Sequence, residues 1–210
     1  QAAANLANVW HWHDQAIITL ARSDFWDDLD LRFPLKHLKL VKQAAQDNTI
    51  APAWIFAIMR QESIFAQDAV SPAGARGLMQ LMWPTAQQVA GEIGLPLPDT
   101  TALLDPSVNI KLGSHYLNKV LQRFDNNIVL ATAAYNAGPN RVNRWLPKRT
   151  MEAEIWVENI PFKETRTYVQ RVMAYILLYR LRLGLKPGSI VERMSPIRSS
   201  QATQTTTKTK

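Results

Sequence analysis

The chain has 210 residues, 47% of them apolar and 20% charged, which is enough to bury the core of one domain of ordinary size. Its net charge of +7 favours anionic partners, although part of this charge lies in the tail from Arg193 onward. The absence of cysteine excludes disulfides, thiolate metal sites and cysteine nucleophiles. Neither a membrane-length apolar run nor a signal peptide is visible, and there is no initiator Met. We therefore expect a mature or excised part of a longer product.

The first 34 residues predict one or two helices, because apolar side chains such as Leu6, Ile17 and Leu20 recur at helical spacing. The stretch "SDFWDDLDLRFP" then offers a Ser or Asp cap, a short helix and a stop at Pro34. This segment is expected to form a separate packing unit. Its Trp and Phe content is high for a linker, which indicates that it docks on another part of the protein.

From Leu35 onward the chain predicts a series of helices. The first covers about residues 38–45, and the second begins at Pro52 and reaches about Phe65. Further helices are expected from residue 84, from 105 to 124, from 128 to 137, over 139–146, and from 164 to Gly184. No stretch alternates with period two for long, so the fold class is all-α. The polar end, "SSQATQTTTKTK", is expected to be disordered.

Glu62 in "RQESIF" is a carboxylate at the end of a mostly apolar helix. It lies four residues after Ile58 and three after Met59, so it shares a face with apolar side chains, and burial there is expected. Desolvation and the negative end of the helix dipole would both raise the pKa of this carboxyl, which suits general-acid catalysis. The alternative is a structural acid paired with Arg60 or Arg76. The residues near Glu62 leave these two interpretations about even.

Two further stretches offer polar groups at helix ends. In "SPAGARGLMQLM" the glycines permit close approach of the backbone to a ligand, and Gln80 could bind an amide of a sugar or peptide. For Met79 and Met82 taken alone, core packing is the better interpretation. Tyr135 and Asn136 in "AYNAGPNRV" could present a hydroxyl and an amide to a groove, or belong to an ordinary helix end.

Other combinations are weak. His11 and His13 lie on different helix faces, and no HExxH or comparable pattern accompanies another histidine, so no metal site is expected. Ser63 has no nearby base and no nucleophile elbow. The basic run that contains Arg141 and Arg144 is typical of a solvated face, or it contacts an anionic group of a partner.

Together these stretches resemble a known family. The pair "ES" at 62–63, "SPAGARGLMQLM" at 71–82, "AYNAGPNRV" at 134–142 and "ENIPFKETRTYV" at 158–169 are similar to the four ordered motifs of soluble lytic transglycosylases. Those are bacterial enzymes that cleave peptidoglycan with a lysozyme-like catalytic domain. The resemblance covers roughly residues 35–185, and "DFWDDLDLRFPL" looks like the junction before that domain in the large, superhelical members.

The resemblance implies a mechanism with one catalytic Glu, here Glu62. It would protonate the oxygen between MurNAc and GlcNAc and then accept the proton of the MurNAc 6-hydroxyl, which attacks its own anomeric carbon. The product is a 1,6-anhydro sugar, and the second carboxylate that most glycosidases need is not required. Carried over from the motifs, the expected substrate-binding residues are Ser71, Gln80, Met82, Tyr135, Asn136 and Glu164, with Ser63 and Tyr168 in support.

The resemblance also implies the organisation and context of the chain. Residues 1–34 would end an α-superhelical linker domain, 35–186 would form a goose-type lysozyme-like catalytic domain, and 187–210 would be a C-terminal extension, disordered from about 198. No cofactor is expected. The expected partner is the peptidoglycan glycan strand, with a monomeric protein in the periplasm and peripheral association with the envelope.

Three other functions remain open from the sequence. A goose-type lysozyme would share the fold and substrate but use water as its nucleophile. A non-catalytic module would bind peptidoglycan through the same residues without turnover. A nucleic-acid binder is the least favoured, because the basic residues are dispersed and no helix-turn-helix or RNA-binding signature is present.

Overall fold

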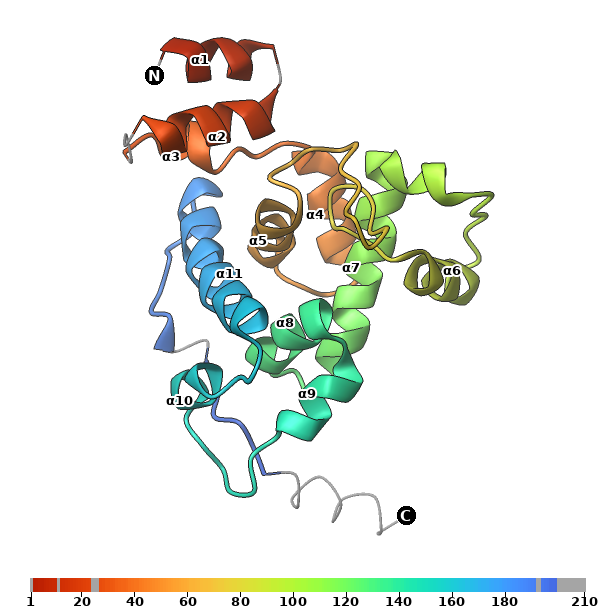
Figure 1. The fold of residues 1–210 in the computed structure, drawn as a ribbon, viewed down its shortest axis with the longest axis vertical. Coiled ribbons are helices and arrows are strands. Elements are labelled where there is room, and N and C mark those ends of the chain that lie inside the picture. Colours follow the sequence, from red (N-terminus) through yellow and green to blue (C-terminus); the bar gives the residue numbers. More distant parts are fainter. Residues whose placement is uncertain (1, 11, 24–26, 192–193, 200–210) are drawn as a thin grey trace. The chain divides into compact units, whose positions relative to one another are not determined.

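The computed structural model describes residues 2–10, 12–23, 27–191 and 194–199. Within these ranges the chain forms helices and isolated bridges but no strand, so the predicted all-α class is confirmed (Figure 1). Two compact units are present: Gln1–Tyr116 with Leu178–Pro187, and Leu117–Leu177 with Gly188–Lys210. Helices α7 (Pro106–Arg123) and α11 (Lys163–Arg182) contribute residues to both units.

The first unit begins with α1 (Ala2–Val9), α2 (His13–Arg22) and the short α3 (Leu29–Arg32), which contact one another. Ala4, Leu20 and Leu31 form their buried cluster. Asp28 caps α3, because its carboxylate accepts a hydrogen bond from the Leu31 N–H at 2.9 Å. The other part of the expected cap and aromatic stretch, residues 24–26, lies outside the described residues.

Helices α4 (Leu38–Asp47) and α5 (Pro52–Glu62) pack against each other in the same unit. Pro52 begins α5 as expected, and every residue from Ala53 to Met59 is buried. The helix was expected to reach about Phe65, but it ends at Glu62. Ile64 and Phe65 adopt left-handed backbone angles, with φ of 53° and 67°, which an α-helix cannot accommodate.

A loop of residues 66–82 (the motif loop) follows and leads to α6 (Trp83–Glu92). The 3₁₀ helix η1 (Thr100–Leu104) and the start of α7 complete this part of the unit. The motif loop is held by paired backbone bridges between Val70 and Arg76 and between Arg76 and Leu81.

The second unit contains α8 (Ile128–Ala137), α9 (Pro139–Trp145), α10 (Ala153–Glu158) and most of α11. Asn127 caps α8 by accepting hydrogen bonds from two backbone N–H groups at 3.1 Å. Helix α10 was not expected from the sequence, because it is too short to show a period; the Trp156 indole N–H anchors it by donating to the Trp145 carbonyl at 2.9 Å.

Part of the C-terminal segment is packed on this second unit. Ile197 is fully buried and bridges Met151 through two backbone hydrogen bonds. The tail expected to be disordered lies largely in residues 200–210, outside the described residues. In the parts of the chain that the structure describes, no helix combines the length and the apolar character needed to cross a membrane.

Candidate active site

Glu62 is the last residue of α5, at the point where the helix leaves the buried core. Ile58 and Met59 in the preceding turn are fully buried, whereas Arg60, Gln61 and Glu62 are all partly exposed. The expectation that Glu62 is buried is therefore wrong. Its fully buried apolar neighbours end one turn earlier, and Glu62 lies at the boundary between the core and solvent. A residue in this position is partly accessible while it follows directly on buried apolar residues.

Ser63 fastens the end of α5 to the motif loop. It is the C-cap residue and is 8% exposed, and its Oγ lies 2.9 Å from the Leu78 carbonyl and 3.2 Å from that of Met59. The same oxygen accepts the Phe65 N–H at 3.1 Å. A hydroxyl engaged in this way is not available as a nucleophile. Ser63 instead sets the direction of the chain directly after Glu62.

Gln80 lies in the motif loop with φ of 47°, and its side-chain amide is directed into the loop itself. Nε2 donates to the Ala69 carbonyl at 3.1 Å and to the Gly77 carbonyl at 2.9 Å. Both donors of the amide are therefore used by the fold, and Oε1 is the atom left to accept a hydrogen bond from a ligand.

Ser71 also stabilises the motif loop. Its Oγ accepts the Ala75 N–H at 3.0 Å, and its backbone N–H donates to the Ala75 carbonyl at 2.9 Å. The two methionines of this loop differ: Met79 is fully buried, which fits core packing, whereas Met82 is 41% exposed just before α6. Met82 is thus available for contact with a ligand and is not a core residue.

Asn109 organises the motif loop and was not identified from the sequence. This fully buried side chain accepts the Met79 N–H at 2.7 Å and donates to the carbonyls of Arg76 at 2.9 Å and Leu103 at 2.8 Å. Backbone groups thus provide hydrogen-bond partners for both the oxygen and the nitrogen of this buried amide. The only signal in the sequence was a polar residue beside Ile110 and Leu112 on the buried part of a helix.

In the second unit, Asn136 is oriented by a neighbouring hydroxyl. Thr165, which is 2% exposed in the first turn of α11, donates from Oγ1 to Asn136 Oδ1 at 2.7 Å. This bond uses the oxygen of the Asn136 amide, so Nδ2 is the group that could donate to a ligand. Tyr135 beside it is partly exposed, Glu164 is exposed, and Tyr168 is 4% exposed.

The predicted site residues thus fall into two sets. Glu62, Ser63 and the motif-loop residues belong to the first unit, while Tyr135, Asn136, Glu164 and Tyr168 belong to the second. That both sets form one site stays a prediction. Among the residues that the structure describes, no group of three or more His, Cys, Asp or Glu side chains could hold a metal ion.

Comparisons with known proteins agree with these motifs. The family model "Transglycosylase SLT domain" matches residues 39–158. The model "Soluble lytic murein transglycosylase L domain" matches residues 1–29, and "Soluble lytic transglycosylase helical domain" matches residues 159–187. The soluble lytic murein transglycosylase of Escherichia coli (strain K12) is 41% identical over 179 residues, which is 84% of this chain but only 28% of that protein.

Two solved structures are also similar. An inactive Glu-to-Gln mutant of the lytic transglycosylase Slt from Pseudomonas aeruginosa has a TM-score of 0.86 and 44% identity, covering 90% of this chain and 31% of that one. The complex of the 70-kDa soluble lytic transglycosylase with bulgecin A has a TM-score of 0.83 and 40% identity, covering 88% and 30%. This chain therefore spans less than a third of these relatives. The ordered motifs, the helical fold and the match over more than half of its residues show that the chain belongs to the Transglycosylase SLT domain family.

Proposed function

We propose that this chain cleaves peptidoglycan glycan strands as a lytic transglycosylase, with Glu62 as its catalytic acid and base. The observation that carries the proposal is the position of Glu62, at the solvent boundary of α5 and fastened through Ser63 to the motif loop of a transglycosylase-family chain. The inactive P. aeruginosa relative carries a Glu-to-Gln substitution, which supports a catalytic Glu.

The reaction needs one carboxyl group in two protonation states. Glu62 donates its proton to the glycosidic oxygen between MurNAc and GlcNAc, and the bond from the MurNAc anomeric carbon to that oxygen breaks. The Glu62 carboxylate then accepts the proton of the MurNAc 6-hydroxyl while O6 bonds to the anomeric carbon. The products are a 1,6-anhydroMurNAc end and a free GlcNAc hydroxyl, Glu62 is protonated again, and no water is consumed.

The remaining site residues bind and orient the sugars. Gln80 Oε1 is suited to accept the N–H of an acetamido group, because both of its amide donors are engaged by the motif loop. Asn136 is suited to donate from Nδ2, since Thr165 occupies its oxygen. Ser71 and Met82 from the motif loop, and Tyr135 and Glu164 from the second unit, would provide further contacts to the glycan, with Tyr168 supporting them.

The first test is the mass of the products released from purified peptidoglycan sacculi. Products with anhydro ends, each one water lighter than the hydrolysed form, are expected. Exclusively reducing-end products would show a lysozyme-type hydrolase and contradict the mechanism. A wild-type chain that binds glycan but releases nothing would show a non-catalytic module.

The second test is Glu62→Gln, which keeps the shape of the side chain and removes the transferable proton. Turnover should fall by about 10²- to 10⁴-fold, with binding of glycan strands and of bulgecin A retained. Glu92→Gln is the matched control, because Glu92 is likewise the last residue of its helix, α6, and belongs to no motif. Turnover lost equally in both variants would contradict a special role for Glu62.

The proposed partner is the glycan strand of peptidoglycan, and the proposed location is the periplasm, where that substrate is found. Both rest on the family and on the names of the relatives. Fractionation of the natural full-length protein, with detection in the periplasmic extract, tests the location.

A further inference from the structure

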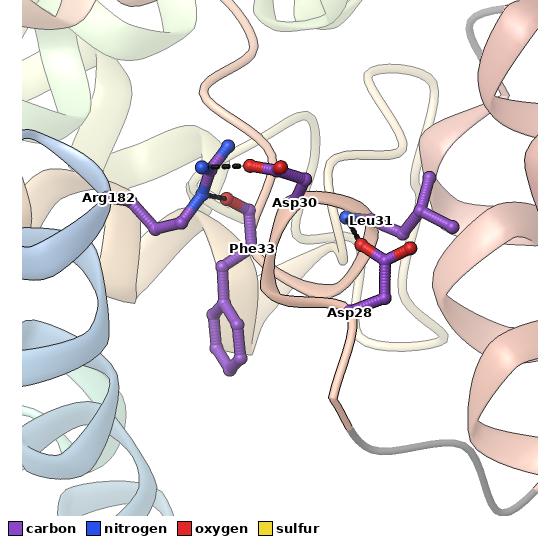
Figure 2. Close-up of polar contacts among 5 residues, drawn as sticks. All are labelled: Asp28, Asp30, Leu31, Phe33 and Arg182. Carbon is purple, nitrogen blue, oxygen red and sulfur yellow. Dashed lines mark hydrogen bonds and ion pairs between the residues drawn. The ribbon is translucent and has the colours of Figure 1, made fainter.

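The segment Asp28–Phe33 (the linker segment) is anchored on both sides by its apolar residues. Leu31 is 5% exposed and is buried with Ala4 and Leu20 of α1 and α2. Phe33 is 2% exposed and packs edge-on against Tyr179 in the last part of α11, with ring centroids 5.5 Å apart. Figure 2 shows these two side chains pointing in different directions from the ribbon. The linker segment thus joins the N-terminal helices to another part of the unit.

Two arginines hold the backbone of the linker segment. Arg182 Nε donates to the Phe33 carbonyl at 3.1 Å, and its guanidinium also pairs with the Asp30 carboxylate (Figure 2). Arg60 Nε donates to the Arg32 carbonyl at 2.9 Å. Hydrogen bonds from a charged donor are stronger than neutral ones, so these two arginines restrict the backbone of the linker segment strongly. They fix it to the last turns of α11 and α5.

The linker segment contacts the turn of α5 that carries Glu62. Arg60 lies two residues before Glu62 in α5, and its guanidinium lies 5.5 Å from the centroid of the Phe33 ring. Tyr179, the other neighbour of Phe33, stacks on Phe56 in the middle of α5, with centroids 5.1 Å apart and planes 20° apart.

The same aromatic cluster extends past the end of α5. Phe65 lies 6.4 Å from the rings of both Phe56 and Tyr179, and its N–H donates to Ser63 Oγ. Arg60, two residues before Glu62, and Phe65, three residues after it, therefore both contact the aromatic cluster that contains Phe33. The Phe33 ring thus contacts Arg60 on one side of Glu62 and, through Tyr179, is linked to Phe65 on the other.

We propose that the linker segment positions Glu62, with Phe33 as the positioning residue and Arg60 and Arg182 as the groups that hold it. The inference rests on the proposed function of Glu62 as the acid. Phe33 acts without touching the substrate, by restricting the last turn of α5. Leu31 attaches the same segment to α1 and α2 and is not part of the contacts that hold Glu62.

The energetic reason is the steep dependence of proton transfer on position. A displacement of about 1 Å at a reacting group can lower a rate by about 10²-fold, even when the altered residue is remote from the chemistry. A buried aromatic ring has few alternative rotamers, and tight packing transmits any change at this position to its neighbours.

The experiment compares Phe33→Ala with Leu31→Ala in the full chain, because both residues are buried in the same segment but face different partners. Both variants should melt at a lower temperature than the wild type. At temperatures where all three are folded, Phe33→Ala should lower kcat for anhydro-product release by about 10- to 100-fold with little change in KM. Leu31→Ala should keep kcat within about twofold of the wild type, because Leu31 packs with Ala4 and Leu20 and not in the aromatic cluster beside Glu62.

The split between kcat and KM separates positioning from a merely structural role. A displaced Glu62 slows the proton transfers but leaves the groups that bind the sugars in place, so kcat should fall in Phe33→Ala while KM stays near the wild-type value. Loss of folded protein alone would lower kcat only in proportion to the folded fraction, which circular dichroism measures. An unchanged kcat in folded Phe33→Ala, or an equal loss in Leu31→Ala, would overturn the inference.

A second pair of variants leaves the core filled, in case Phe33→Ala does not fold. Arg182→Gln removes the charged donor to the Phe33 carbonyl and should lower kcat by about tenfold. Asp30→Asn removes only the ion pair of a side chain that is 77% exposed, and it should match the wild type. If Arg182→Gln had wild-type activity, the positioning role of the linker segment would be contradicted while the proposed function would stand. An inactive wild-type chain would instead overturn the proposed function.

Discussion

One hydrogen bond from the Thr165 hydroxyl decides which atoms of the Asn136 amide are left for a ligand. Thr165 is nearly fully buried and donates to Asn136 Oδ1, and Gln80 in the other unit shows the opposite arrangement, with both amide donors engaged and the oxygen left over. The two amides thus present complementary groups. The orientation of each amide is set by its hydrogen-bond partners in the fold, and the identity of the residue alone does not specify it.

Thr165→Val tests this arrangement at the residue scale, because valine has nearly the same shape but no hydroxyl. The variant should lose about 1–2 kcal/mol in the free energy of unfolding and about tenfold in kcat/KM, since Asn136 loses its fixed orientation. Urea unfolding and initial-rate measurements check the two effects. Thr165→Ser keeps the donor and should retain most of the activity; if both variants behave alike, the hydroxyl does not orient Asn136.

At the scale of an element, the motif loop depends on a close approach between its backbone and residues of η1 and α7. Gly77 has φ of 74°, and a Cβ there would lie 2.2 Å from the Leu103 carbonyl oxygen and 2.4 Å from Asn109 Nδ2. Asn109 in turn holds the loop through Met79 and Arg76. Glycine at position 77 is therefore required by both backbone angle and space.

Gly77→Ala should destabilise the protein by about 3 kcal/mol or more, because a left-handed backbone strain and a steric clash add to each other. Gly74→Ala is the comparison within the same loop: its φ is 87°, but no atom lies within 4 Å of the added Cβ. It should cost only about 1–2 kcal/mol. Equal losses in thermal or urea unfolding would mean that the approach to Asn109 is not tight in solution.

At the scale of the whole molecule, folding brings together charged groups from separate parts of the sequence around His37. Its pKa is lowered mainly by burial, and further by the charges of Lys36 and His13, while Asp105 opposes the shift. Among the described residues, its Nε2 is buried without a hydrogen-bond partner. The folded protein therefore favours the neutral imidazole.

The free energy of unfolding should consequently fall as the pH drops below about 6.5, the ordinary pKa of histidine, because the unfolded chain then binds a proton that folded His37 resists. The free energy of unfolding stops falling once the pH lies below the lowered pKa of His37 in the folded protein. His37→Asn should reduce this dependence below about pH 6.5. Asparagine tolerates the left-handed φ of 60° at this position, so the backbone is kept. Identical slopes of stability against pH in urea unfolding would refute the role of His37.

Local features of the fold were predictable from the sequence, because they depend on neighbouring residues. Pro52 at the start of α5, Asp28 before α3 and Gly138 after α8 act within one turn of the chain, and the expected helices were found at these places. Helix α10 and the early end of α5 were not predicted, since a short helix shows no period and the angles of Ile64 and Phe65 are set by their surroundings.

The sequence by itself determined the helical class, the order of four motifs and, through them, the family. Only the tertiary structure decided that Glu62 is partly exposed, that Gln80 keeps just its oxygen free, and that Asn109 and Phe33 stabilise the surroundings of the predicted site. The physical reason is distance along the chain: Asn109 and Arg76 are 33 residues apart, and Arg182 and Phe33 are 149 apart. Side-chain exposure and hydrogen-bond partners depend on such remote contacts, which neither periodicity nor local propensity encodes.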